Sequence, residues 1–180
     1  MKWFSFLLMI TVTSLSAATV CTDSLGNAAR DLSGLPMGWR HYATEIQGQT
    51  GTRQITTVQG KPAVVMKDDG PGEIGFFREF DVPEGRYWHA SIQAALPKGA
   101  RANDAFVLQL TFLGGKSTSQ AVRLEVGKQT FEQFDLYMQA PAGARKVRCY
   151  IYSHKPHIGA VAVRDLKIET SSKQIGRAHV

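Results

Sequence analysis

Hydrophobic and polar residues alternate along most of the chain, in short runs that glycine and proline separate. The runs lie at about 39–46, 53–58, 62–67, 73–82, 86–96, 104–113, 120–126, 130–138, 145–154 and 160–169. Turn-forming stretches such as VQGKP, DDGPG, VPEG, LPKGA and APAGA lie between them. Short strands at near-regular spacing with turn signals between them are typical of a β-sandwich or barrel. We predict an all-β jelly-roll sandwich of two antiparallel sheets over about 22–170, without a significant helix.

The period of two assigns one face of each strand to the core. In the closing run the alternation shifts by one position near Asp165, because Leu166 and Ile168 are apolar there. A slip of one residue in 86–96 would move Trp88 out of the core. The predicted inward residues are Trp88, Ala90, Ile92, Ala94 and Leu96; Phe106, Leu108, Leu110 and Phe112; Phe134, Leu136 and Met138; Val147, Cys149 and Ile151; and Val161 and Val163.

Two of these runs carry unusual side chains on the face opposite the apolar set. A solvated strand face usually carries Lys, Glu, Thr and Ser, whereas these faces carry aromatic rings between planar polar groups. The run 86–96 contributes Tyr87, His89 and Gln93, and the stretch RCYIYSH contributes Arg148, Tyr150, Tyr152 and His154.

A surface of this composition suits a carbohydrate, provided that both runs lie in the same sheet. An aromatic ring stacks against the apolar C–H face of a pyranose, and the planar polar groups bind its hydroxyls. We predict that Tyr150 and Tyr152 are the stacking platforms and that the other five residues surround them, with Tyr87 at the margin. The alternative is that Tyr150, Tyr152 and His154 lie at the edge of the core under a loop.

The N-terminal residues are excluded from the fold. Residues 1–18 combine Lys2, an apolar run and small residues up to Ala18, a pattern that predicts a secretory signal peptide. The apolar run is too short and too polar to span a bilayer comfortably. We therefore expect a secreted protein, extracellular or periplasmic, without a membrane partner after signal cleavage.

The predicted domain occupies 35–170, after an N-terminal leader at 19–34 and before a tail at 171–180. Residues 175–180, IGRAHV, match one reading frame of a common sequencing adapter. We expect them to be an assembly artefact and the natural chain to continue past Gln174.

Charge argues against a nucleic-acid partner. The formal net charge is +6, and the basic residues are scattered. The longest basic stretch, ARKVR at 144–148, is too short to predict binding to nucleic acid. A modest attraction to acidic polysaccharide is compatible with this balance.

The chain has two cysteines, Cys21 and Cys149. In an exported protein such a pair can form a disulfide. Alternatively, Cys149 is a small buried apolar residue and Cys21 lies in the leader.

Four stretches of the chain carry separate motifs: LPMGW (35–39), FFREFDVPEGRYWHASIQA (76–94), TFEQFDLYMQAPAGARKVRCYIY (130–152) and GAVAVRDLKIE (159–169). In order and spacing they resemble the galactose-binding-like jelly roll of the carbohydrate-binding modules attached to bacterial glycoside hydrolases. The resemblance implies a non-catalytic module that binds a polysaccharide or oligosaccharide. It also implies a downstream catalytic domain in a longer chain, to which this module is the N-terminal accessory.

The chain departs from that family where a structural calcium is common. The opening segment CTDSLGNAARDLSG lacks the Asn-rich strand of the family, and the closing acidic pair is reduced to Arg164–Asp165. Of the residues that would bind a structural calcium, the resemblance therefore implies Asp165 alone. We expect that the protein requires no other cofactor.

No motif of a known catalytic chemistry occurs. There is no Ser nucleophile elbow, zinc motif or phosphate loop. Adjacent Asp68 and Asp69 would point to opposite faces of a strand and cannot flank one glycosidic bond, so we assign them to a turn. Two alternatives to a binding module stay open: a structural or protein-binding sandwich, and a jelly-roll polysaccharide lyase that uses Tyr, His, Arg and Gln on one face.

Overall fold

The computed structural model describes residues 17–27, 35–43, 51–82, 86–154 and 158–172. These residues form eleven strands: β1 (Ala18–Asp23), β2 (Arg40–Ala43), β3 (Gly51–Val58), β4 (Lys61–Asp68), β5 (Ile74–Asp81), β6 (Tyr87–Ala95), β7 (Phe106–Leu113), β8 (Thr118–Arg123), β9 (Glu132–Gln139), β10 (Lys146–Ser153) and β11 (Gly159–Ser171). This part of the chain contains no helix that is long and apolar enough to cross a membrane.

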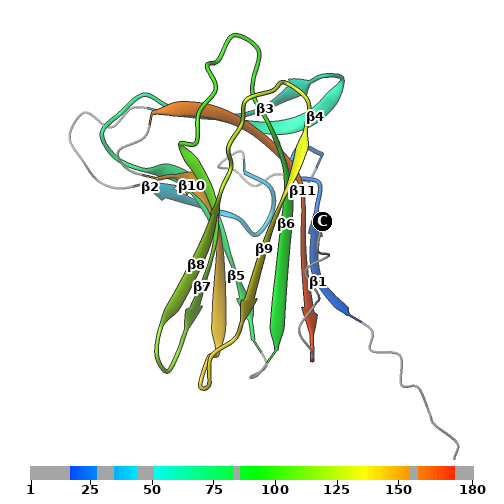
Figure 1. The fold of residues 1–180 in the computed structure, drawn as a ribbon, viewed down its shortest axis with the longest axis vertical. Helices are drawn as coiled ribbons and strands as arrows, with labels where there is room; N and C mark the ends of the chain where they lie inside the picture. The colour runs from blue at the N-terminus through cyan, green and yellow to red at the C-terminus, as the bar shows by residue number, and fades with distance from the viewer. Residues whose placement is uncertain (1–16, 28–34, 44–50, 83–85, 155–157, 173–180) are drawn as a thin grey trace, which may run out of the picture.

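The strands pack as two antiparallel sheets (Figure 1). One sheet has the order β3-β4-β11-β6-β9, with β1 also paired to β11, and the other has the order β2-β5-β10-β7-β8. Each of the ten predicted runs corresponds to one of β2 to β11. The predicted all-β sandwich is confirmed.

Strand β11 organises the six-stranded sheet. Its first half pairs with β4 and its second half with β1, while β6 lies along its other edge. The register to β6 shifts by one residue between Arg164 and Lys167, and Asp165 has a φ of 49°. This is a β-bulge, which bends a strand and changes which residues face inward. The predicted shift of alternation near Asp165 is therefore confirmed.

Residues that we expected to form a leader belong to the fold. Strand β1 pairs with β11 along residues 18–23, and Leu25, which follows it, is fully buried. The described domain therefore begins before residue 35. Most of the predicted signal peptide (1–16) and the adapter-like residues 175–180 lie outside the described residues.

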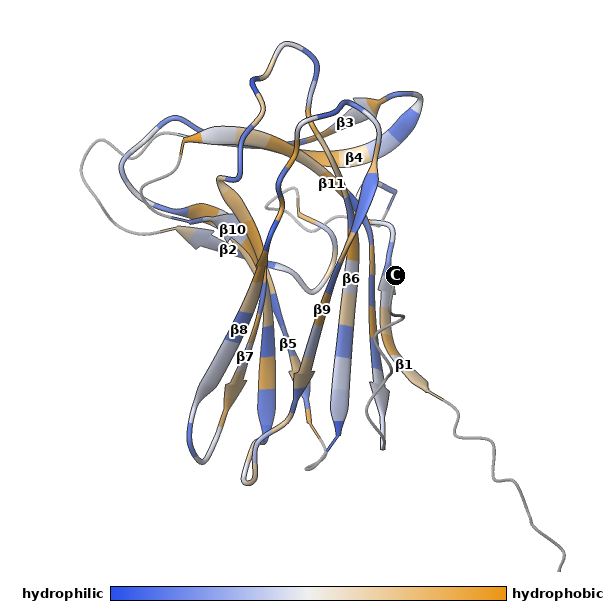
Figure 2. Cartoon of the chain, in the orientation of Figure 1, coloured by the Kyte–Doolittle hydropathy of each residue, from blue (hydrophilic) through white to orange (hydrophobic). Residues whose placement is uncertain are grey.

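The core lies between the two sheets and consists largely of the predicted inward residues. Figure 2 shows hydrophobic and hydrophilic bands alternating along the strands. Nearly all of the predicted inward residues are buried, and Phe134 and Met138 are partly buried against them. Trp39 and Trp88 are each 1% exposed, so Trp88 belongs to the core. Period-two alternation thus assigned the inward faces correctly.

The two cysteines are buried and both thiols are free. Cys149 faces the core from β10, and burial raises the pKa of its thiol. Cys21 lies in β1 and not in a leader, with its sulfur 3.9 Å from the guanidinium of Arg78. The structure therefore contains no Cys21–Cys149 disulfide, and both cysteines act as small core residues.

The substitution Leu110→Ala tests whether Leu110 faces the core from β7. Leu110 is 0% exposed, so Leu110→Ala removes buried apolar surface and leaves a cavity. We expect the free energy of unfolding to fall by about 2–5 kcal/mol, measured by urea denaturation. Gln120→Ala, at an exposed position on β8, is the control and should change it by about 0.5 kcal/mol or less. An equal effect of both substitutions would contradict the assigned register.

Candidate functional site

The structure separates the seven predicted binding residues into two groups. Strand β6 lies in the six-stranded sheet and β10 in the five-stranded sheet. The outer face of the first carries Tyr87, His89 and Gln93; the outer face of the second carries Arg148, Tyr150, Tyr152 and His154. The two groups point away from each other across the core and do not form one surface. The single carbohydrate-binding surface was predicted on the condition that both runs lie in one sheet, and the structure does not meet this condition.

The β10 group joins two aromatic residues from other strands. Tyr42 of β2 lies edge-on to Tyr150 and Tyr152, with ring centroids 5.4 and 5.2 Å apart. Phe77 of β5 lies 5.3 Å from Tyr150 at an interplanar angle of 31°. We call these four residues (Tyr42, Phe77, Tyr150 and Tyr152) the aromatic patch. Such offset and edge-on contacts favour a fixed arrangement of rings.

Gly75 makes the close approach of the two strands' tyrosines feasible. It is the register partner of Tyr152 on one side and of Tyr42 on the other. A Cβ at this position would lie 2.2 Å from the carbonyl oxygen of Ile151 and 2.5 Å from the Cβ of Tyr152. Because glycine has no side chain, the tyrosine rings of β2 and β10 meet above it.

Tyr152 is more buried than a stacking platform would be. Its residue exposure is 7%, and its hydroxyl donates to Oε1 of Gln109 on β7, 2.8 Å away. Tyr150 remains half-buried and accessible. The alternative of an edge-of-core residue therefore fits Tyr152, while Tyr150 fits the predicted platform.

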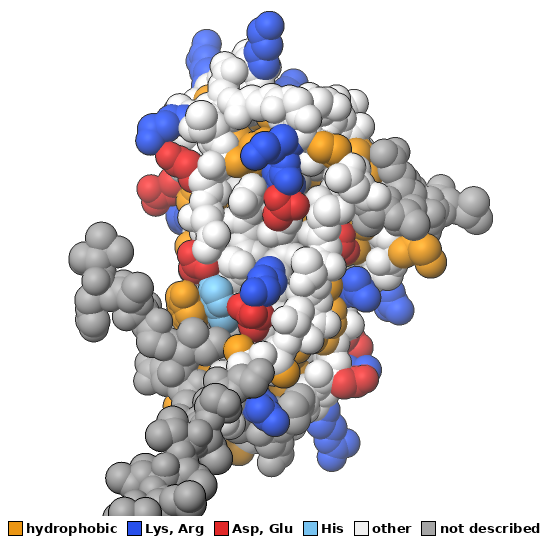
Figure 3. Space-filling model, turned by 90° about the vertical axis from the view of Figure 1, so that its right-hand side faces the viewer, with side chains coloured by type: hydrophobic (Ala, Val, Ile, Leu, Met, Phe, Trp, Pro, Cys, Tyr) orange, Lys and Arg blue, Asp and Glu red, His pale blue; other side chains and the backbone are white. Residues whose placement is uncertain are grey.

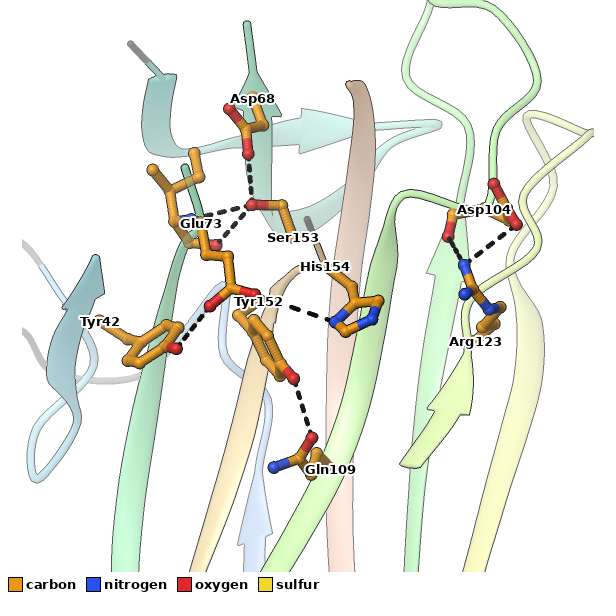
Figure 4. A network of polar contacts seen from close by, with 10 residues as sticks. Tyr42, Asp68, Glu73, Asp104, Gln109, Arg123, Tyr152, Ser153 and His154 are labelled. Atoms are coloured by element: carbon orange, nitrogen blue, oxygen red, sulfur yellow. Dashed lines mark hydrogen bonds and ion pairs between the residues drawn. The ribbon is translucent and has the colours of Figure 1, made fainter. Parts of the chain in front are cut away.

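A polar network borders the aromatic patch (Figure 4). The Tyr42 hydroxyl donates to Oε2 of Glu73 at 2.6 Å, and the other carboxylate oxygen lies 3.9 Å from Nδ1 of His154. Burial and this hydrogen bond to Glu73 raise the pKa of Tyr42. Burial, with a smaller contribution from the Glu73 charge, raises the pKa of Tyr152. Both phenols are therefore neutral hydrogen-bonding groups over the physiological pH range.

A buried polar link lies beneath this network. Ser153 of β10 donates its hydroxyl proton to Oδ2 of Asp68 on β4, and the backbone N–H of Ile74 donates to the same hydroxyl at 2.8 Å. Oδ1 of Asp68 accepts from the N–H of Gly70 at 2.9 Å, the local bond expected of a turn aspartate. Asp68 is 0% exposed, so it holds the turn and joins the two sheets.

The other side of the aromatic patch is polar and its charges are paired. Arg148 lies over the Phe77 ring, 5.6 Å from its centroid, and its Nε donates to Oε2 of Glu79 at 2.9 Å. The contacts with Arg148 and Lys146 lower the pKa of Glu79. Towards β8, the amide of Gln109 donates to Thr111, whose hydroxyl lies 3.0 Å from that of Ser119. A ligand on this face would therefore meet an aromatic ring with amides, hydroxyls and a guanidinium beside it.

His89, on the opposite outer face, is engaged by its own neighbours. Its ring stacks on Tyr137 with centroids 4.4 Å apart. Nε2 lies 2.7 Å from Asp135, and Nδ1 lies 3.6 Å from Glu169. A hydrogen bond and ion pair with Lys167, together with the nearby His89, lower the pKa of Glu169. These contacts tie β6, β9 and β11 together and leave His89 little capacity for a ligand.

Asp165, the predicted calcium ligand, binds an arginine. Its Oδ2 accepts a hydrogen bond from Nε of Arg164 at 2.6 Å and forms an ion pair with Nη2 of the same residue, also at 2.6 Å. Among the described residues, no group of three or more His, Cys, Asp or Glu side chains is placed to hold a metal ion. The donor set at Asp165 does not fit a calcium site, and the calcium expectation stays a prediction without support from these contacts.

Sequence reasoning missed four residues of this site: Tyr42, Glu73, Phe77 and Gln109. The period of two places Gln109 on the outer face of its strand, between the inward Leu108 and Leu110, but does not connect it with RCYIYSH. Phe77 follows Phe76, so two apolar residues in succession hid which one faces outward. A hydrogen-bonding side chain at an outward position was a signal that could have suggested Gln109. Only the structure shows that β2, β5, β10 and β7 are neighbouring strands.

Comparison with known proteins shows the fold. No family model matches the chain, and no curated protein sequence matches it. The CBM22-1 xylan-binding domain of Paenibacillus barcinonensis Xyn10C aligns with a TM-score of 0.59 and 13% identity, over 89% of this chain and 99% of that domain. The CBM22-1–GH10 modules of Clostridium thermocellum Xyn10B, solved with xylohexaose, align at 0.58 and 12%, over 91% of this chain and 30% of that one.

A third match comes from a bacteriophage protein. The enzymatically active domain of tailspike protein 4 from bacteriophage CBA120 aligns with a TM-score of 0.58 and 17% identity, over 81% of this chain but only 21% of that one. At such identities the matches show the fold alone. The solved structures that match this chain are mostly carbohydrate-binding modules, so the predicted resemblance to these modules is confirmed at the level of the fold.

Gly75→Ala tests how the aromatic patch is built. The new methyl group meets backbone and Cβ atoms that cannot rotate away, so β5 and β10 must separate. We expect a loss of about 1–3 kcal/mol in unfolding free energy. The near-ultraviolet circular dichroism of the tyrosines should change with it. Gly127→Ala is the matched control, since a Cβ there meets nothing within 4 Å. Equal spectra for wild type and Gly75→Ala would contradict this account.

The shifted tyrosines predict how stability depends on pH. An ordinary tyrosine has a pKa of about 10, and the folded-state pKa of both Tyr42 and Tyr152 is higher. Their contribution to stability is therefore complete below about pH 10 and is lost as the pH rises towards the folded-state values. Spectrophotometric titration should show tyrosines that ionise late, and Tyr42→Phe should remove one of them. An unchanged titration curve in Tyr42→Phe would refute the assignment.

Proposed function

We propose that the chain binds carbohydrate without catalysing its cleavage, on the outer face of the five-stranded sheet. The observation that carries this proposal is the aromatic patch, in which an accessible ring is flanked by hydrogen-bonding side chains. Tyr150 is the stacking platform, supported from one side by Phe77 and held at its edges by Tyr42 and Tyr152.

The groups around Tyr150 match the two faces of a sugar ring. The C–H face of a pyranose packs on the aromatic ring, and its hydroxyls reach the amide of Gln109, the hydroxyl of Thr111 and the guanidinium of Arg148. Tyr152 acts indirectly, because its hydrogen bond holds Gln109 in place. An open face with one main platform binds weakly, with a Kd of roughly micromolar to millimolar.

The fold supports the same proposal. One matched module is described as xylan-binding, and another match was solved with xylohexaose. We extend the proposal to an exported accessory module of a longer glycan-active enzyme, on the basis of the signal-like residues 1–18 and the family resemblance. Expression with its own leader, followed by N-terminal sequencing of the exported protein, tests the export; cleavage after Ala18 is expected and retention of Lys2 would oppose it.

Affinity electrophoresis of Tyr150→Ala tests the binding face. In gels with xylan, galactan, β-glucan or pectin, we expect the wild type to be retarded by at least one polysaccharide. Tyr150→Ala should weaken that retention at least tenfold, about 1.4 kcal/mol, because the platform is lost. Tyr150→Phe should retain binding, since it keeps the ring. Tyr137→Ala is the matched control, an aromatic on the opposite outer face, and should bind as the wild type does.

Other outcomes identify the alternatives. Release of unsaturated oligosaccharides from an acidic polysaccharide would show that the chain is a lyase and not a non-catalytic binding module. No retardation in any polysaccharide gel would favour a structural or protein-binding sandwich. Retardation that Tyr137→Ala weakens and Tyr150→Ala does not would place the site on the other sheet.

A further inference from the structure

A hollow lies on the side of the sandwich opposite the aromatic patch, on the outer face of the six-stranded sheet. It has a volume of about 280 Å³ and lies where the end of β1, the bulge of β11 and the neighbouring parts of β6 and β9 meet. Figure 3 shows this side of the molecule, where acidic and basic side chains lie in touching pairs. The hollow is separate from the aromatic patch, because the core lies between the two sheets.

The bulge of β11 explains why a hollow forms on an otherwise regular sheet. Arg164 pairs with Gln93 and Lys167 with Ser91, so β11 has one more residue than β6 between these positions. The extra residue is accommodated by Asp165 in the left-handed region and by an interrupted ladder. A non-glycine residue there costs free energy, and such positions are often found at ligand sites.

The walls of the hollow offer hydrogen-bonding groups that the protein does not use. Gln93 and Gln133 lie side by side as register partners on β6 and β9. The amide nitrogen of Gln133 donates to Asp135, which leaves its carbonyl oxygen as an acceptor. Among the described residues, the side chains of Ser24, Ser91 and Gln93 make no hydrogen bond to another residue. Several donors and acceptors are therefore directed at one small space.

The charged groups around the hollow are all paired within the protein. Asp165 is bound by Arg164 at 2.6 Å, and Lys167 by Glu169 at 2.7 Å. Asp23 accepts from the indole N–H of Trp39 at 2.8 Å. A hard cation needs several free oxygen ligands and an anion needs a free positive charge, so neither is favoured here. The chemistry favours a neutral ligand that is rich in hydroxyl groups.

We propose that this hollow, the bulge pocket, binds one ring of a neutral sugar as a second site. Its volume of about 280 Å³ is just below the range of small-molecule pockets, roughly 300–1,000 Å³, which suits one ring better than a chain. Amide and hydroxyl groups from Gln93, Gln133 and Ser91 bind the sugar hydroxyls, without an aromatic platform. This second site goes beyond the proposed function, because it does not require that the aromatic patch bind anything.

Nuclear magnetic resonance titration of the whole protein tests the bulge pocket. The probes are methyl β-xyloside, methyl β-galactoside and methyl β-glucoside, with galacturonate as the anionic comparison. We expect the side-chain amide signals of Gln93 and Gln133 to shift with at least one neutral glycoside, saturating in the millimolar range. They should shift at least tenfold less with galacturonate at the same concentration.

Two variants localise the effect. Gln93→Ala combined with Gln133→Ala should abolish the shift of the backbone amide of Ser91, while Gln139→Ala, on β9 outside the pocket, should leave it unchanged. Tyr150→Ala should also leave it unchanged, which separates this site from the aromatic patch. A melting curve within a few degrees of the wild type shows that the double variant is folded.

Three results would overturn the proposal: no saturable shift of either glutamine with any neutral glycoside, an equal response to galacturonate, or an unchanged Ser91 shift in the folded double variant. Should the double variant unfold, Gln93→Glu provides the second measurement, and an unchanged glycoside affinity in it would also overturn the proposal. A wild type that no polysaccharide gel retards, or a Tyr150→Ala variant that is retarded as strongly as the wild type, would count against the aromatic patch alone, so the two proposals fail separately.

Discussion

The central strand β10 imposes the constraint on which the rest of the structure depends. Each of its residues faces only one side, so a single stretch of sequence determines the core and the surface at once. Val147, Cys149 and Ile151 fill the space between the sheets, and the positions between them form the outer face. Because β10 pairs with β5 and β7, it also determines that Phe77 and Gln109 lie beside its tyrosines.

Alternation was sufficient to locate β2 to β11, their inward residues and the register shift of the closing strand, whereas β1 lies in the segment that we expected to be a leader. It could not identify neighbouring strands, because the pattern within a strand contains no information about its pairing partner. This is why the single binding surface could be predicted only on the condition that β6 and β10 lie in one sheet. Tyr42 lies in a strand of four residues, too short for a periodic signal. The burial of Tyr152 depends on Gly75 in another strand, which no local pattern reveals.

The aromatic patch is fixed from two directions. From the solvent side, ring contacts hold the tyrosines of β2 and β10 against each other. From the interior, the hydrogen bonds of Ser153 with Asp68 and Ile74 hold the end of β10 against β4 and β5. A buried carboxylate costs free energy unless its oxygens are hydrogen-bonded, and Ser153 and Gly70 meet that need. Among the described residues, the face is therefore held in place by contacts between the strands of the sandwich.

The distribution of aromatic residues also divides the optical signals of the protein. Trp39 and Trp88 lie in the core, each 1% exposed, whereas the aromatic patch contains tyrosine and phenylalanine only. An indole buried between the sheets keeps the same surroundings whether or not a molecule rests on the outer face. Emission from these two tryptophans thus reports whether the sandwich is folded. While that emission stays constant, a change in tyrosine absorption indicates that the surroundings of an outer-face tyrosine such as Tyr150 have changed without unfolding.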